Sequence, residues 1–197
     1  MFNQGFCAAG CGRQAITGSA LCAIHLADSE ADAKRLGEYM ISEKSIKDIS
    51  VQGLHFRDLD LSNHQFYGCN FTGTVFTRCL FTRAVMRLNF FDFSTLISCD
   101  FSNLDSQFLS LAGSIIQDCS FEGSELVNIN FEGAIISNSI FNKSNLYNSC
   151  FVSSSISKSD FIDCNLKRTN FVNTQREKIS YKSSNTAEAI FELEEYR

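Results

Sequence analysis

The chain has 197 residues, of which 44% are hydrophobic, and this bounds it to one principal domain with room for a terminal appendage. Its formal net charge of −5 argues against direct binding to nucleic acid. It lacks both a stretch of about 18 apolar residues that could cross a membrane and the basic, then apolar, N-terminus of a secretion signal. We therefore expect a cytoplasmic protein that makes no membrane contact.

Residues 1–27 carry the spacing of a small metal site. Three cysteines and one histidine supply the regular tetrahedral ligand set of a structural Zn²⁺, one per chain. Gly10 and Gly12 permit a tight turn between the first two ligands. The stretch resembles the zinc knuckles with the pattern C-x3–4-C-G-[RK]…G-x-C-x2-H, and its four protein ligands disfavour catalytic zinc. Unliganded thiols in a disordered leader and a disulfide are the alternatives. The predicted ligands are Cys7, Cys11, Cys22 and His25.

Residues 28–45 are predicted to form a helix that caps the segment after it. Asp28 or Ser29 can act as N-cap, and the acidic residues that follow suit a helix N-terminus. An apolar side faces one way, and we expect it to cover the open end of the next segment. Its members are Leu26, Ala33, Leu36, Met40 and, less regularly, Tyr39.

Residues 46–175 repeat with a period of five. An apolar residue returns at every fifth position from Ile46 to Phe171, and Ser106 is the only polar member of the series. This period fits neither a helix nor a strand and is typical of a repeat architecture. Two residues before each large residue comes a small one, so the unit reads small–polar–large apolar–x–x.

The units "CNFTG", "CSFEG", "SDFID" and "TNFVN" resemble the pentapeptide-repeat family, whose consensus is A-[DN]-[LF]-x-x. The resemblance implies an all-β solenoid, a right-handed quadrilateral β-helix in which each pentapeptide forms one side and four sides form a coil. Positions 20 apart should then stack, and two columns of mostly Phe support this. They are Leu61, Phe81, Phe101, Phe121, Phe141, Phe161 and, on the opposite side, Phe71, Phe91, Leu111, Phe131, Phe151, Phe171.

The interruption at Ser106 has two interpretations. Leu104 occupies the small slot just before it, so large and small residues can have exchanged places at constant interior volume. Alternatively, the coil between residues 102 and 111 is bulged, with Phe108 turned outward. The inward small slots also hold five cysteines, which we expect to be free thiols packed as small hydrophobes: Cys69, Cys79, Cys99, Cys119 and Cys164.

Residues 176–197 are expected to form a C-terminal cap and helix. Asn185 and Glu188 make an approximate capping box, and Ile190, Leu193 and Tyr196 would share an apolar side. The family resemblance implies that such a helix either caps the rod or builds a homodimer.

No motif supports an enzyme, since the chain has no phosphate-binding loop, nucleophile elbow or zinc-protease motif. We expect a non-enzymatic protein-interaction scaffold whose partner is unknown. The family resemblance adds a DNA mimic that binds DNA gyrase, and a secreted effector scaffold is a further alternative. One continuous acidic side would favour the mimic, and scattered charge the scaffold. The candidate partner-binding residues are Asp92, Asp105, Glu125 and Glu132.

Overall fold

The structure is a computed structural model that describes residues 5–192. Helix α1 (Ser29–Ser42) begins at the expected N-cap, because the Asp28 carboxylate accepts a hydrogen bond from the Ala31 N–H at 2.9 Å. Glu30 and Asp32 lie in its first turn, where the helix dipole favours negative charge. No helix within residues 5–192 is long and apolar enough to span a membrane.

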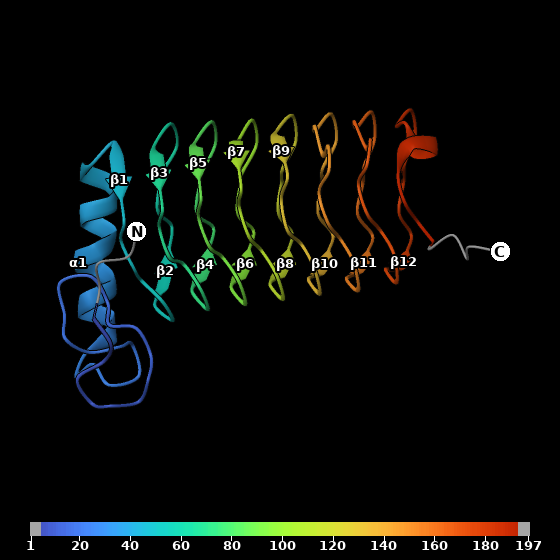
Figure 1. Ribbon diagram of the computed structural model, residues 1–197. Helices are drawn as coiled ribbons and strands as arrows, with labels where there is room; N and C mark the ends of the chain where they lie inside the picture. The colour runs from blue at the N-terminus through green and yellow to red at the C-terminus, as the bar shows by residue number, and fades with distance from the viewer. Residues whose placement is uncertain (1–4, 193–197) are drawn as a thin grey trace.

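Twelve strands of three residues follow α1 and form two parallel sheets (Figure 1). The five-stranded sheet has the order β1-β3-β5-β7-β9, and the seven-stranded sheet β12-β11-β10-β8-β6-β4-β2. The strands are β1 (Ser45–Lys47), β2 (His55–Arg57), β3 (Gln65–Tyr67), β4 (Val75–Thr77), β5 (Val85–Arg87), β6 (Thr95–Ile97), β7 (Asp105–Gln107), β8 (Ile115–Gln117), β9 (Glu125–Val127), β10 (Ile135–Ser137), β11 (Ser155–Ser157) and β12 (Gln175–Glu177).

Residues paired in the parallel ladders are 20 positions apart, so about seven coils of four sides stack into a rod. We number the sides in chain order. Side 1 holds the five-stranded sheet and side 3 the seven-stranded sheet. Side 2 carries the bridged column from Ser50 through Phe90 to Ile190, and side 4 the column from Asp60 to Ser180. The four-sided parallel β-helix predicted from the sequence is confirmed.

The core is built from the expected Phe columns. Phe101 stacks on Phe121 with ring centroids 4.9 Å apart and an interplanar angle of 3°. In the opposite column, Phe131 stacks on Phe151 at 4.6 Å and 6°. The two columns meet edge to face, as Phe121 and Phe131 do at 6.3 Å and 87°. Both geometries are the favoured ones for aromatic pairs, so the core gains contact energy beyond its burial.

The small inward slots are polar for a reason that the structure makes visible. The Ser144 hydroxyl donates to the Phe121 carbonyl at 2.7 Å, and the Ser149 hydroxyl to the Leu126 carbonyl at 2.6 Å. These two buried hydroxyls thus pair with the backbone of the coil before them, whereas the Ser114 and Ser154 hydroxyls donate within their own coil, to the carbonyls of Leu111 and Phe151 at 2.7 Å. Pairing with a carbonyl offsets the desolvation cost of a buried hydroxyl. Thiols make similar contacts, such as Cys99 Sγ to the Phe76 carbonyl at 3.5 Å, and all nine cysteines are free.

The coil at Ser106 keeps its register. Ser106 pairs with Met86 and Leu126 in the ladder, and both Ser106 and Leu104 are buried. The Ser106 hydroxyl donates to the Glu125 carbonyl at 2.9 Å. The exchange of large and small residues is therefore the correct interpretation, and no bulge forms. Phe108 does point outward, with 55% of its surface exposed.

Helix α1 lies across the N-terminal end of the rod (Figure 1). Its buried residues are Ala33, Leu36, Gly37 and Met40, and Gly37 lies beside the side chains of Leu59 and Phe56. Tyr39 lies on the other side of the helix and is exposed. The apolar side of α1 thus packs onto the main core, through Ala33, Leu36 and Met40.

The α-helix predicted from residue 185 onward is wrong for the part that the structure describes. Only one 3-10 turn, η1 (Thr186–Glu188), forms, and the Asn185 side chain makes no cap hydrogen bond. Instead, Asn185 Oδ1 accepts from the Leu166 N–H at 2.6 Å, and Phe191 stacks on Phe171 at 5.2 Å. Ladder pairing with the previous coil has overridden the local capping signal. Leu193 and Tyr196 lie outside the described residues.

The last coil ends the apolar columns with a charge. Arg176 stands in register with Ile156, in a slot that is apolar in every earlier coil of side 3. Its side chain is exposed, and the guanidinium carbon lies 4.7 Å from the centroid of the Phe191 ring. A cation over an aromatic face is attracted by the ring quadrupole, so Arg176 covers this end of the core.

Candidate metal centre

The N-terminal segment folds into two turns that bring its four predicted ligands together. The first turn is closed by hydrogen bonds from Gly10 N–H to the Cys7 carbonyl (2.9 Å) and from Cys7 N–H to the Arg13 carbonyl (2.8 Å). Gly10 and Gly12 have φ of 72° and 74°, a left-handed conformation that glycine adopts without strain. The His25 N–H bonds to the Cys22 carbonyl at 2.9 Å and fixes the second ligand pair.

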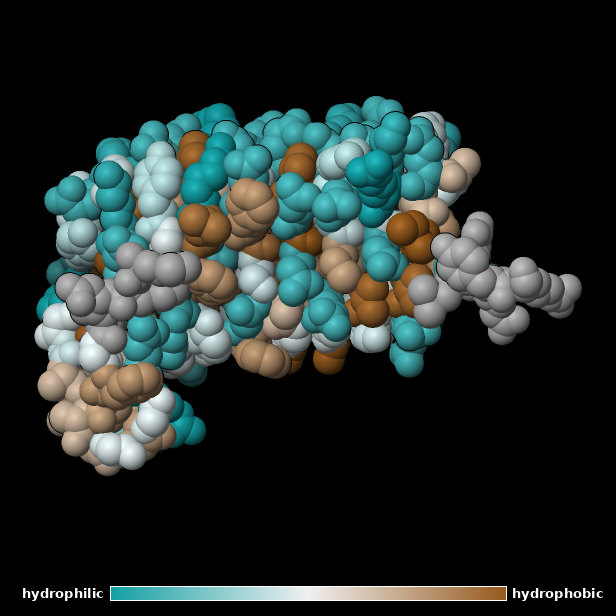
Figure 2. Space-filling model, viewed as in Figure 1, coloured by the Kyte–Doolittle hydropathy of each residue, from teal (hydrophilic) through white to brown (hydrophobic). Residues whose placement is uncertain are grey.

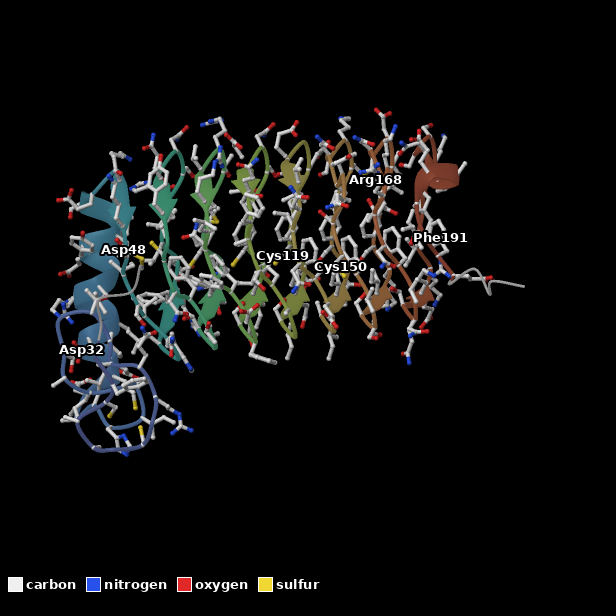
Figure 3. All side chains as sticks on the ribbon, in the orientation of Figure 1. Asp32, Asp48, Cys119, Cys150, Arg168 and Phe191 are labelled. Atoms are coloured by element: carbon white, nitrogen blue, oxygen red, sulfur yellow. The ribbon has the colours of Figure 1, made fainter. Side chains whose placement is uncertain are left out.

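The ligand atoms of Cys7, Cys11, Cys22 and His25 all lie within 4.8 Å of one another. His25 Nδ1 is 3.4 Å from the sulfurs of Cys7 and Cys22, and the Cys11 and Cys22 sulfurs are 3.7 Å apart. A tetrahedral Zn²⁺ with Zn–S near 2.3 Å and Zn–N near 2.0 Å separates two sulfurs by about 3.8 Å and sulfur from nitrogen by about 3.5 Å. The four residues therefore fit a zinc ion. Figure 3 shows sulfur atoms among the N-terminal loops.

Electrostatics prepare part of this set for a cation. A hydrogen bond from the Arg13 backbone lowers the pKa of Cys11 to about 6, and one from the Cys22 backbone lowers the pKa of Cys7. Burial raises the pKa of Cys22. The thiolate is the form that binds metal, and the lowered pKa values of Cys7 and Cys11 favour this form at two of the three sulfurs. A bound zinc would supply a structural cross-link and no open position for a substrate.

The described N-terminal segment, residues 5–27, which we call the knuckle, is attached to the N-terminal part of side 2. Thr17 N–H donates a hydrogen bond to the Ser50 carbonyl at 2.9 Å, and Ser50 N–H donates one to Thr17 Oγ1 at 2.8 Å. The Gln14 amide oxygen accepts from the side chains of Gln52 and Asn70, at 2.9 and 3.0 Å. Ile16 is buried in the main core. A metal in the knuckle would thus fix a surface that is continuous with the rod.

The four candidate acidic residues do not form one site. Asp105 and Glu125 are neighbours in the ladder of side 1, whereas Asp92 and Glu132 lie on side 2. The Asp105 carboxylate pairs with Arg87 at 2.7 Å, and Glu125 accepts from the Asn145 amide at 2.7 Å. Further acidic residues stand on sides 3 and 4, where Glu122 pairs with Lys143 at 3.0 Å. The negative charge is therefore scattered.

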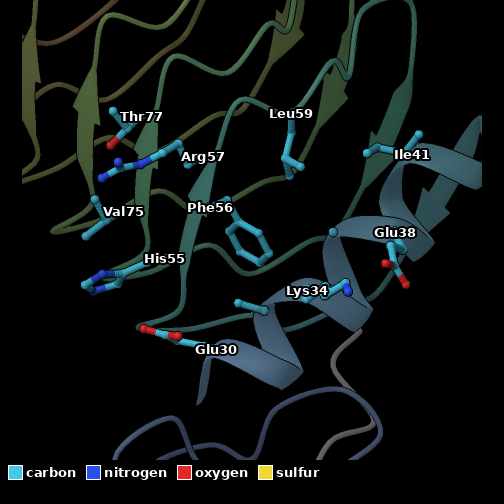
Figure 4. Close-up of a pocket in the computed structure, with 12 residues that line it drawn as sticks. Glu30, Lys34, Glu38, Ile41, His55, Phe56, Arg57, Leu59, Val75 and Thr77 are labelled. Carbon is cyan, nitrogen blue, oxygen red and sulfur yellow. The ribbon is translucent and has the colours of Figure 1, made fainter. Parts of the chain in front are cut away.

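A groove of about 500 Å³ lies between α1 and side 3 (Figure 4). Its floor is apolar, with Phe56, Leu59 and Val75, and its rim mixes the charges of Glu30, Lys34 and Arg57. Among the described contacts, no hydrogen bond joins these rim side chains into an acid–base pair. The groove runs along the line where α1 packs on the rod.

Two family models match the chain. Residues 60–103 match pentapeptide repeats in eight copies, and residues 114–191 match a pentapeptide repeat region. The chain belongs to the pentapeptide-repeat family. No curated protein matches this pentapeptide-repeat protein.

Several solved structures share the fold. One is a trypsin-treated form of QnrB1, described as a plasmid-mediated fluoroquinolone resistance protein, with 14% identity, a TM-score of 0.46, and coverage of 72% of this chain and 83% of that one. Another is HetL, involved in heterocyst differentiation regulation, from the cyanobacterium Nostoc sp.. It has 11% identity and a TM-score of 0.34 over 84% of this chain and 97% of its own. At these values, neither informs the function of this pentapeptide-repeat protein.

The corners of the rod carry two exposed apolar residues, Leu88 and Phe93, that the sequence alone did not single out. Every fifth residue from Asp48 to Ser183, two places after each inward large residue, has positive φ. Glycine, asparagine, aspartate and other polar residues hold almost all of these corner slots. Among the corners from Asp48 to Ser183 of this pentapeptide-repeat protein, only Leu88, Phe93 and Phe108 carry large apolar side chains. The sequence does mark these residues, because each is an apolar residue two places after the inward large one, at a position of the five-residue unit that is otherwise polar or glycine.

Proposed function

We propose that this protein is a non-enzymatic scaffold that binds other proteins through the outward sides of its rod. The observation that carries the proposal is the continuous ladder between coils, as in the bonds from Asn70 N–H to the Ile49 carbonyl (2.8 Å) and from Phe71 N–H to the Phe90 carbonyl (2.7 Å). It holds the outward side chains in fixed columns. A partner then binds a surface that is already ordered, which lowers the entropic cost of association.

One structural Zn²⁺ per chain in the knuckle belongs to the same proposal. The ion would hold the two turns of the knuckle together. Packing alone contributes little there, because Cys7 and Cys22 are small side chains and cannot fill a core as Phe does. Nine free thiols favour a reducing compartment, and we propose the cytoplasm.

The test is cross-linked affinity capture with the full zinc-loaded chain, followed by purification of each captured protein and binding in solution. We expect at least one protein to bind directly and stoichiometrically, with binding reduced by substitutions on one side of the rod. Failure of every purified candidate to bind directly would contradict the scaffold function.

The gyrase alternative has one observation in its favour, the two adjacent carboxylates of Asp105 and Glu125 on side 1. The ion pair between Asp105 and Arg87 reduces the negative field there. If the protein mimics DNA, binding should fall steeply with salt, because charges separated by more than about 10 Å are screened at 0.1 M. Replacing both Asp105 and Glu125 with Lys should then abolish gyrase binding without changing the melting temperature. If the wild-type protein does not bind gyrase even at a concentration of about tens of micromolar, this alternative is excluded.

A further inference from the structure

The three apolar corners lie together on the molecule. Leu88 and Phe108 are one coil apart at the corner between sides 1 and 2, and Phe93 stands at the other corner of side 2. Their exposed fractions are 52%, 55% and 71%. Phe90, half-buried, lies on side 2 between them. Figure 2 shows brown and tan atoms gathered on the side toward the viewer, over the coils that carry β5 and β7. We call Leu88, Phe90, Phe93 and Phe108 the aromatic patch.

The three corner residues of the patch, Leu88, Phe93 and Phe108, contribute little to the fold. At φ near 56°, a bulky side chain is disfavoured relative to the Asn, Asp or Gly that fill other corners. Exposure also leaves most of their surface in water, so burial does not offset the strain. The Phe93 ring lies over Gly113 of the next coil, where an added Cβ would come within 2.6 Å of Cε1. The ring therefore packs against the Gly113 backbone on one side and is exposed on the other. Strained, exposed and ordered aromatic residues are the features of a binding surface.

Side 2 also has a distinct charge. From Ser50 to Glu192, its outward slots hold Asp92, Glu132 and Glu192 but no Lys or Arg. The Asp92 carboxylate is fixed beside the patch, because it accepts hydrogen bonds from the Ser110 hydroxyl and the Ala112 N–H. Arg87, which precedes Leu88 on side 1, is engaged by Asp105. The surroundings of the patch are thus apolar and negative.

We propose that the aromatic patch binds a cationic amphipathic segment of a partner protein, with apolar side chains against the patch and Lys or Arg beside Asp92 and Glu132. The proposal rests on the scaffold function and names the surface and the chemistry of the partner. A second copy of this chain is a poor occupant, since a two-fold contact between the two patches would place acidic residues of side 2 near their own copies with no cation between them.

The knuckle adjoins this surface. Gln14 bonds to Asn70, which is the bridge partner of Phe90 in the next coil. Phe6, paired with Gln14 in the knuckle, is 80% exposed. The partner segment can therefore extend from the patch toward the knuckle.

The test uses the full chain and two synthetic helical peptides. Both have Leu at i, i+3, i+4 and i+7 spacing, one with Lys and the other with Glu at the remaining positions. The triple variant Leu88→Asn, Phe93→Asn and Phe108→Asn removes the patch, and Asn suits the corner conformation. The matched control, Leu80→Asn with Ile140→Asn, removes two exposed apolar residues of side 4. Binding is measured by fluorescence anisotropy, folding by circular dichroism and association state by sedimentation.

We expect the Lys peptide to bind the wild type and the control alike, and the triple variant about tenfold or more weakly. The Glu peptide should bind about tenfold or more weakly than the Lys peptide. The triple variant should melt at the wild-type temperature or above it. Equal binding to the triple variant, equal binding of the two peptides, no binding, or a wild-type dimer that the triple variant dissolves would overturn the proposal. A directly binding partner that is retained by the triple variant would preserve the scaffold function while refuting this surface.

Discussion

The rings of Phe101 and Phe121 lie 4.9 Å apart and within 3° of parallel, although 20 residues separate them in the chain. Their separation is the spacing of neighbouring strands, so the backbone ladder and the aromatic column impose the same repeat. Each coil is therefore stabilised by the coil on either side of it and by little else.

Replacing Phe121 with Ala should destabilise the protein by about 3–5 kcal/mol, because it empties a fully buried site in the middle of a column. Urea denaturation followed by circular dichroism measures the change. Glu122→Ala is the matched control, since its ion pair with Lys143 is exposed and contributes about 0–1 kcal/mol. Equal losses at the two positions would show that the inward register is wrong.

Leu104 and Ser106 should behave as a coupled pair. Leu104→Ala leaves a cavity and should cost about 2–5 kcal/mol, whereas Ser106→Leu adds volume to a filled coil and should cost about 1–3 kcal/mol. The double variant Leu104→Ser with Ser106→Leu restores the usual order of small and large residues and should lose much less than the sum. Strict additivity in the denaturation experiment would be inconsistent with the exchange described here.

The purified protein should contain about one zinc per chain, as a closed site of three Cys and one His requires. Cys22→Ser should remove the metal and increase hydrogen exchange in residues 5–27. The rod should melt as before, because its aromatic columns do not include the knuckle. Metal analysis that finds no zinc in protein purified without chelator would refute the site.

The buried thiols should resist alkylation at pH 8. Burial raises the pKa of Cys69 to about 12 and that of Cys164 to about 11, so both stay protonated in the folded protein. An unfolded thiol has its ordinary pKa of 9.0, so the free energy of unfolding should fall as pH rises from about 9 toward 12, where unfolding releases protons. Mass spectrometry after iodoacetamide treatment should show modification of half-buried Cys150 first, and of Cys11 once zinc is removed. Early labelling of Cys69 in folded protein would contradict this order.

Much of the fold follows from the sequence because a five-residue period leaves few alternatives. The positions of Phe81 and Phe101, 20 apart, already imply a four-sided coil, and the ligands from Cys7 to His25 are close in the chain. Such short-range constraints can be read without a structure.

Two features could not be obtained in this way. The helix expected after Asn185 depended on a local signal, whereas the competing bond from Leu166 N–H to Asn185 comes from the preceding coil. That Leu88 and Phe93 flank the same side of the rod, side 2, and point outward follows from the positive φ of each corner, which the structure shows. Both are consequences of long-range pairing, which propensity does not encode.

Arg176 limits how these rods can assemble. A solenoid end with an apolar column and unpaired strand edge invites a second solenoid to continue the stack, and repetition would produce a fibre. A second rod stacked end to end here would have to bury the Arg176 guanidinium, which costs on the order of several kcal/mol unless the incoming rod pairs it with a carboxylate. With α1 across the opposite end, both ends of the rod within residues 5–192 disfavour stacking onto a second rod, so growth into a fibre is opposed at each end.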